Sequence, residues 1–147
     1  MENKLRILFL CTGNACRSQM AEGFARNMKG DVLEVFSAGI VAHGLNSLAI
    51  QVMREAGVDI TEQWSKTIEE LNDREFDYVI TVCDNASENC PYFPAGIRVI
   101  HKGFDDPPVL ARNAGSFEGE LDCYRRVRDE IKAFIKELPD FLKGNAE

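Results

Sequence analysis

The sequence predicts an α/β fold, a small open parallel sheet with helices on both faces. Short apolar runs of strand length alternate with longer segments in which apolar residues recur every three or four positions. Strands that alternate with helices in this way pair in parallel through right-handed crossovers. The chain has 147 residues, 45% of them hydrophobic, which is enough for one core. We therefore expect a single domain over residues 1–147.

The first part of the chain contains two predicted strands and two predicted helices. Lys4–Leu10 is a nearly continuous apolar run, typical of a buried strand, and Arg17–Met28 follows as a helix. Leu33–Ala38 is the second strand, closed by a glycine. Ser47–Ala56 is the second helix, because its apolar residues lie on one face, and Gly57 ends it.

The second part adds two strands and two helices. Thr67 and Glu70 have the spacing of a capping box, which predicts a short helix over Ile68–Leu71. Tyr78–Val82 is a β-branched third strand, and Ile97–His101 is a fourth. A long terminal helix is predicted from apolar residues at intervals of three and four: Leu121, Tyr124, Val127, Ile131, Phe134 and Leu138.

The ends of the chain carry no pattern of a membrane anchor. Pro139 limits the terminal helix, and we expect the polar tail Gly144–Glu147 to be frayed. The apolar run Ile7–Leu10 is too short for a signal-peptide core or a membrane span. Five cysteines without a secretory signal indicate reactive thiols rather than a disulfide framework, and so a cytoplasmic protein.

The charge of the chain excludes one class of partner. The formal net charge is -7 at pH 7, so a nucleic acid would be repelled at long range. A small anion can bind only where a local positive field opposes the global one. In open α/β sheets ligands bind at the carboxyl edge of the strands, so we expect that field in a loop after a strand.

The loop after the first strand has the composition of an anion cradle. It consists of Cys11, Thr12, Gly13, Asn14, Ala15, Cys16, Arg17 and Ser18. Backbone N–H groups of such a loop can converge on one anion at a helix N-terminus, and their partial positive charge would lower the pKa of Cys11. Arg17 offers a planar fork of donors for two oxygens of a tetrahedral anion. On spacing alone, Cys11 could also be a core residue and Arg17 a surface residue.

This loop resembles the signature of the low-molecular-weight protein tyrosine phosphatase superfamily: a nucleophilic cysteine, five residues, an arginine, then serine or threonine. The longer run CTGNACRSQMAEG, together with Ser-Ala-Gly at 37–39, is similar to the thioredoxin-coupled arsenate reductases on that fold. The likeness extends from Lys4 to about Leu138. It implies a three-layer sandwich around a four-stranded parallel sheet in the order 2-1-3-4. It also implies that the chain reduces arsenate with electrons from thioredoxin, and we expect the chain to be a monomer.

Two further cysteines favour a reductase over a phosphatase, because reducing arsenate takes two electrons as well as a nucleophile. Cys83 directly follows the third strand, so we expect it at the same sheet edge as Cys11. Cys90 comes seven residues later, across a segment that spans roughly 24 Å when extended. That segment must coil or refold to form a disulfide, and we expect a helical turn that loosens on oxidation.

A relay between these thiols is our mechanistic hypothesis. Cys11 attacks arsenate, Cys83 attacks the adduct and releases arsenite, and Cys90 then attacks the Cys11–Cys83 disulfide. The resemblance implies the same order and an exposed Cys83–Cys90 disulfide that thioredoxin reduces. Two alternatives stay open: the thiols are inert, or they bind zinc with His101 or Cys123, although their spacing does not match the usual zinc pairs.

The acid that protonates the leaving oxygen is expected in the segment Phe104–Pro108, which follows the fourth strand. In the superfamily the acid is the aspartate directly before proline. This carries over to Asp106 and leaves Asp105 to cap or brace the loop. The tyrosine phosphatases place aromatic residues just after that Asp-Pro to hold a phenyl ring. Here Val109 and Leu110 follow instead.

No metal and no bound cofactor are predicted. Some of these reductases hold a potassium ion with residues matching Asn14, Glu22, Ser37 and an acidic residue near Ser65. Lys66 stands there in this sequence, so we expect a lysine in place of the cation. Asn14 is expected to steady the cradle by hydrogen bonding to its own backbone.

Two other functions remain as alternatives. A tyrosine phosphatase would use the same Cys11, Arg17 and Asp106 to hydrolyse phosphate monoesters through a phospho-cysteine, and Cys83 and Cys90 would merely protect the nucleophile from oxidation. A redox sensor or phosphoprotein-binding module is disfavoured, because a complete catalytic set is present. Cys16 is expected to contribute only a backbone donor, and Cys123 only packing. Sequence alone leaves open whether thioredoxin or another thiol system is the electron donor.

Overall fold

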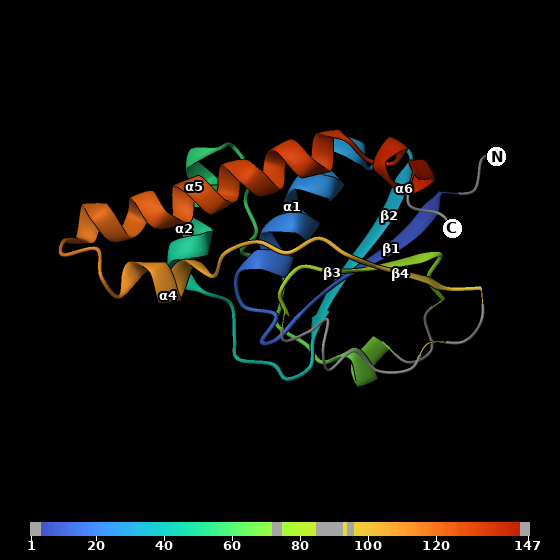
Figure 1. Ribbon diagram of the computed structural model, residues 1–147, viewed down its shortest axis with the longest axis horizontal. Coiled ribbons are helices and arrows are strands. Elements are labelled where there is room, and N and C mark those ends of the chain that lie inside the picture. Colours follow the sequence, from blue (N-terminus) through green and yellow to red (C-terminus); the bar gives the residue numbers. More distant parts are fainter. Residues whose placement is uncertain (1–3, 72–74, 85–92, 94–95, 145–147) are drawn as a thin grey trace.

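A four-stranded parallel sheet forms the centre of the computed structural model, which describes residues 4–71, 75–84, 93 and 96–144 (Figure 1). Its strands are β1 (Leu5–Cys11), β2 (Leu33–Gly39), β3 (Tyr78–Thr81) and β4 (Arg98–His101). They pair in the order β2-β1-β3-β4, and every pairing is parallel. The predicted fold class and strand order are confirmed, and each predicted strand boundary lies within one residue of the observed one.

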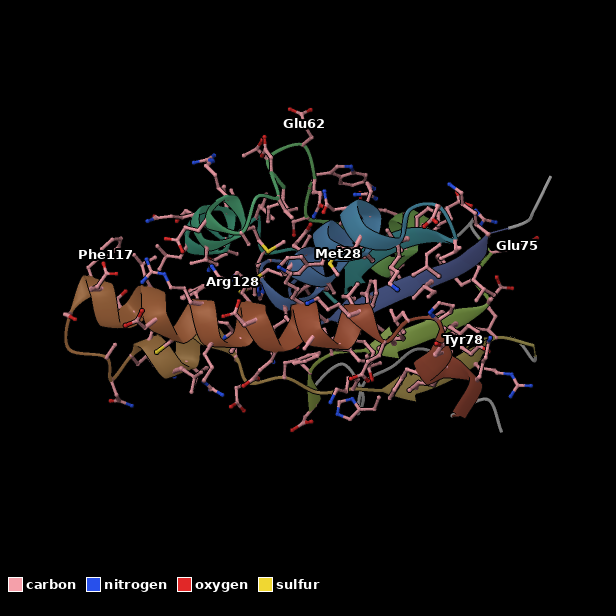
Figure 2. The ribbon with its side chains drawn as sticks, turned by 90° about the horizontal axis from the view of Figure 1, so that it is seen from above. Met28, Glu62, Glu75, Tyr78, Phe117 and Arg128 are labelled. Carbon is pink, nitrogen blue, oxygen red and sulfur yellow. The ribbon has the colours of Figure 1, made fainter. Side chains whose placement is uncertain are left out.

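Helices lie on both sides of this sheet. The long helices α1 (Arg17–Lys29) and α5 (Phe117–Lys136) lie on one side, and the short 3-10 helix η1 (Ile68–Leu71) lies on the other (Figure 1). α2 (Ser47–Glu55) packs against α5. Seen from above, α5 runs lengthwise over the sheet from Phe117 at its outer end (Figure 2).

The helix ends follow from local hydrogen bonds. Thr67 N–H donates to Glu70 Oε2 at 2.9 Å, as the capping box predicts. α5 begins before the first residue of its apolar stripe because Ser116 Oγ accepts from Gly119 N–H at 3.0 Å and caps the helix. The stripe itself is buried as expected, with Leu121, Tyr124, Val127, Ile131, Phe134 and Leu138 all at most 4% exposed.

Two short helices were not predicted. α4 (Pro107–Ala111) begins with two prolines, whose fixed φ suits the first turn of a helix. α6 (Asp140–Gly144) includes the first residue of the tail that was expected to be frayed. Residues 145–147 lie outside the described part of the chain. Both helices have five residues, too few to give a periodic apolar pattern.

The parallel register brings the functional loops together. Ile7, Leu8, Phe9 and Leu10 of β1 are fully buried, so this strand forms the middle of the core. Cys11 pairs with Gly39, and Thr81 pairs with both Leu10 and His101. The carboxyl ends of all four strands therefore meet at one edge. Among the described residues, none of the helices is long and apolar enough to cross a membrane.

Candidate active site

The loop between β1 and α1 is held by the segment after β2. Four of its carbonyl oxygens, those of Cys11, Thr12, Gly13 and Ala15, accept backbone hydrogen bonds of 2.9 to 3.1 Å from Ile40, Val41, His43 and Asn46. This pairing turns the carbonyl groups away from the interior of the loop. Cys16, the N-cap residue of α1, makes no side-chain cap hydrogen bond. The N-terminus of α1 therefore has backbone donors suited to an anion.

Asn14 fixes the tightest bend of this loop. Its φ is 50°, in the left-handed region, and its side chain is fully buried. Asn14 Nδ2 donates to Ser18 Oγ at 2.8 Å and to Ser37 Oγ at 3.0 Å. Asn14 Oδ1 accepts from Gln19 Nε2 at 2.9 Å and from Lys66 N–H at 3.0 Å. Asn14 thus stabilises the loop through side-chain hydrogen bonds to α1, β2 and the segment before η1, rather than through a local turn.

Gly39 matters for the shape of the site in a way that the sequence alone did not predict. A Cβ at this position would lie against Val41 O, and 2.8 Å from both Asn14 N and Thr12 O. These are backbone atoms of the cradle and of the segment that pairs with it, so they cannot move aside cheaply. Only glycine lets β2 approach the loop this closely, which explains the Ser-Ala-Gly sequence.

Arg17 connects the cradle to the loop after β4. Its Nη1 donates to Phe104 O at 2.9 Å, and its Nη2 lies 3.5 Å from Asp106 Oδ2. The side chain is 11% exposed, and its buried Nε has no hydrogen-bond partner within the described parts of the chain. A buried donor without a partner costs about 1–3 kcal/mol, and an oxyanion in the cradle would satisfy it.

The two candidate acids have different surroundings. Asp105 Oδ2 lies 3.0 Å from Arg126 Nη2 on α5, so Asp105 braces its loop against that helix. Asp106 pairs with Arg17, and both residues line a cavity of about 660 Å³ with Cys11 and Cys83. The geometry therefore favours Asp106 as the group that faces a bound anion.

Cys83 lies beside the cradle, as its position after β3 predicted. Its Sγ is 3.1 Å from Thr12 Oγ1, and it hydrogen-bonds with the Cys11 thiol. This bond and burial raise the pKa of Cys11 well above its usual range, although the charge of Arg17 opposes them. The prediction of a lowered Cys11 pKa is wrong for this arrangement, because the buried thiol pair outweighs the positive field.

Comparison with known proteins places this site in a family. The model for low molecular weight phosphotyrosine protein phosphatases matches residues 6–147. The chain belongs to this family. A relative from Bacillus subtilis, named arsenate reductase, is 48% identical over 140 residues, which cover 95% of this chain and 98% of that protein.

Solved structures of phosphatases and reductases are equally similar in backbone. A thioredoxin-dependent arsenate reductase from Corynebacterium glutamicum matches with a TM-score of 0.70 at 27% identity, over 98% of this chain and 64% of that chain. A low molecular weight protein tyrosine phosphatase from T. tengcongensis matches with a TM-score of 0.71 at 27% identity, over 95% of this chain and all of that chain. The relative at 48% identity is named arsenate reductase, and the resemblance inferred from the sequence is confirmed.

This member of the phosphatase family differs from a tyrosine phosphatase in the residues after its Asp-Pro. Val109 and Leu110 lie on α4 after the two prolines that follow Asp106, and Val109 is 45% exposed. They are aliphatic, where a phosphatase would need aromatic rings beside a phenyl group. Of the α4 residues, Pro108 lines the cavity.

Lys66 supplies a buried positive charge behind the cradle of this family member. Its Nζ lies 3.9 Å from Glu22 Oε1, and the two side chains are 6% and 7% exposed. Glu22 Oε1 also accepts from Ser37 Oγ at 2.5 Å, and Ser37 accepts from Asn14. Burial lowers the pKa of Lys66, while Glu22 opposes this shift. The lysine thus lies where the sequence predicted it in place of a cation.

Metal ligands do not gather in the described part of the chain, where no three His, Cys, Asp or Glu side chains form a possible metal site. His101 makes close contacts with both ring nitrogens, to Thr81 Oγ1 at 2.8 Å and to Asp84 Oδ1 at 3.1 Å. Cys123 is on α5, partly exposed. The expectation that no metal is bound stays a prediction.

The sequence also predicts roles for two other cysteines, Cys16 and Cys90. Cys16 is 6% exposed, and burial raises its pKa, as does the nearby charge of Asp106. Its thiol is therefore a poor nucleophile, in agreement with a role for its backbone alone. Cys90 lies outside the described residues. Its distance from Cys83 and the expected refolding of that segment stay predictions.

Replacing Cys83 with alanine will lower the pKa of Cys11, because the hydrogen bond between the two thiols is the largest cause of its rise. The measurement is the pH dependence of Cys11 alkylation by iodoacetamide, followed by peptide mass spectrometry. The inflection will move to lower pH in Cys83→Ala and will stay in place in Cys123→Ala, a cysteine outside the cavity. An unchanged or higher inflection in Cys83→Ala contradicts the thiol pair.

Replacing Lys66 with methionine will lower the free energy of unfolding by about 2 kcal/mol, because it leaves the Glu22 carboxylate buried beside a neutral side chain. The double variant Glu22→Gln/Lys66→Met will recover most of this loss, since it removes both charges. Arg26→Met is the matched control, because Arg26 pairs with Glu22 from an exposed position. Urea unfolding of the four proteins measures the effect, and equal losses in Lys66→Met and the double variant contradict it.

Proposed function

We propose that this chain reduces arsenate to arsenite by a thiol–disulfide relay of Cys11, Cys83 and Cys90, and that thioredoxin then resets it. The observation that carries the proposal is the second thiol, Cys83, hydrogen-bonded to Cys11 inside an anion cradle. Hydrolysis of a phosphate ester needs no second thiol in its chemical steps, whereas this reduction requires one. The 48% identity to a relative named arsenate reductase supports the same activity.

Arsenate binding is proposed to use the whole cradle. The backbone N–H groups of residues 12–18 surround three oxygens of the tetrahedral anion, and Arg17 grips two of them with its guanidinium. The buried Arg17 Nε supplies a donor that the described residues do not use. Because the side chain is anchored on Phe104 O, binding does not have to order it first.

The first chemical step is a nucleophilic displacement at arsenic. The proton of Cys11 has an acceptor in the basic oxygens of the bound arsenate, which compensates for the raised pKa of this thiol. The Cys11 thiolate forms a sulfur–arsenic bond, and one arsenate hydroxyl leaves as water after it takes a proton from Asp106. Arsenic remains As(V) in this adduct.

The second step carries the electrons. The Cys83 thiolate attacks Cys11 Sγ, so that a sulfur–sulfur bond forms and the sulfur–arsenic bond breaks. The electron pair of the broken bond stays on arsenic, which leaves as As(III) in arsenite. Two thiols have then become one disulfide, which balances the two electrons. The contact between Thr12 Oγ1 and Cys83 Sγ holds the attacking sulfur beside its target.

The last steps return the enzyme to its reduced form. Cys90 attacks Cys83 in the Cys11–Cys83 disulfide, the Cys83–Cys90 disulfide forms, and Cys11 leaves as a thiolate. A dithiol partner then reduces the Cys83–Cys90 disulfide. We infer that this partner is thioredoxin, because a thioredoxin-dependent arsenate reductase matches 98% of this chain. Reactive thiols of this kind favour the reducing cytoplasm as the place of action.

Phosphatase activity is the second candidate, because the family model itself is that of a phosphatase. The same Cys11, Arg17 and Asp106 can form and hydrolyse a phospho-cysteine. One assay separates the two activities: arsenite formation with arsenate, thioredoxin, thioredoxin reductase and NADPH, run beside hydrolysis of an aryl phosphate. NADPH loss that requires both arsenate and thioredoxin selects the reductase. Fast ester hydrolysis without that loss selects the phosphatase.

Replacing Cys90 with serine will limit arsenite release to about one equivalent per enzyme, because the Cys11–Cys83 disulfide then has no internal thiol to resolve it. Rapid-quench measurement of arsenite with excess thioredoxin gives the number of turnovers. Cys123→Ser is the matched control, and it will turn over like the unchanged protein. Sustained turnover of Cys90→Ser would remove the third thiol from the mechanism.

Replacing Asp106 with asparagine will slow formation of the Cys11 adduct by about a hundredfold or more, because the leaving oxygen loses its proton donor. Asp105→Asn will lose much less, since that carboxylate pairs with Arg126. Single-turnover arsenite release in the two variants measures the effect. A larger loss in Asp105→Asn would reverse the assignment of the acid.

A further inference from the structure

The side chains around the cavity carry more negative than positive charge. Three carboxylates line it, those of Asp84, Asp105 and Asp106, together with one guanidinium, that of Arg17. Arg17 Nη1 already donates a hydrogen bond to Phe104 O, and Arg17 Nη2 forms an ion pair with Asp106. The chain as a whole has a formal net charge of -7. An incoming oxyanion is therefore repelled until it reaches the cradle itself.

His43 is the one other described side chain lining the cavity that can carry a positive charge. Its backbone N–H donates to Gly13 O at 2.9 Å, which fixes this residue against the cradle. A Cβ at Gly13 would lie 2.5 Å from His43 Nδ1, so the ring rests directly on the Gly13 backbone. The side chain is at the same time exposed to solvent. The imidazole thus lies at the mouth of the cavity, between solvent and the anion cradle.

We propose that His43 is a substrate-binding residue at the mouth of the cradle, whose imidazolium draws the oxyanion in and donates a charged hydrogen bond to it. An imidazolium donates through both ring nitrogens, and a charged donor binds an anion more strongly than a neutral one. His43 lies outside the backbone donors of the cradle, so an incoming anion meets it first. A single positive charge there offsets the repulsion of the anion by the negatively charged chain. The identity of the anion as arsenate rests on the proposed function, whereas anion binding at His43 does not.

The test compares anion binding by the unchanged protein, His43→Gln and His43→Lys. The readout is the concentration of arsenate, or of inorganic phosphate, that halves the rate of Cys11 alkylation by iodoacetamide. At low ionic strength His43→Gln will need about three- to fivefold more of either anion, and the difference will shrink at high ionic strength. His43→Lys will bind as tightly as the unchanged protein or more tightly. Lys136→Gln, which removes an exposed positive charge away from the cavity, is the control for net charge.

Two results overturn the proposal. Equal anion concentrations for His43→Gln and the unchanged protein show that the imidazole does not bind the anion. A His43→Lys variant as weak as His43→Gln shows that the shape of the ring over Gly13 matters instead of its charge. Failure of the proposed function looks different, since arsenate and phosphate would protect Cys11 while no arsenite forms.

Discussion

The site depends on a backbone loop that turns its carbonyl oxygens outward and its amide groups inward. Such a loop is unstable alone, because it gathers parallel dipoles and requires a left-handed residue. Here N–H groups of the segment 40–46 donate hydrogen bonds to the carbonyl oxygens of the loop, and Asn14 is held at φ 50° by side chains from α1 and β2. Gly39 permits the close approach of the two backbones. The positions of Cys11 and Arg17 follow from this packing.

Positively charged side chains lie beside the cradle although the chain as a whole is negatively charged. Arg17 lines the cavity, and Lys66 lies behind the cradle against Glu22. The link from Lys66 through Glu22 and Ser37 to Asn14 joins a buried ion pair to the bend of the loop. Removing one member of a buried pair is costly, so this link stabilises the cradle as well as the fold.

A reductase and a phosphatase can share this cradle because both begin with a thiolate attack on a tetrahedral oxyanion. They differ in the group that acts next on the covalent adduct. Water must reach the adduct in a phosphatase, whereas Cys83 already lies beside Cys11 in this chain. The same neighbour raises the pKa of Cys11.

The sequence by itself determined the parallel sheet, the cradle loop and the place of Cys83, and its resemblance to the phosphatase superfamily implied the strand order. Apolar runs and spacing are local signals, and parallel strands bring their carboxyl ends to one edge. Only the tertiary structure decided the direction of the Cys11 pKa shift, the pairing of Asp106 with Arg17 while Asp105 pairs with Arg126, and the need for Gly39. Each of these depends on contacts between segments far apart in the chain, whose energies arise from burial and distance and leave no periodic pattern along the sequence.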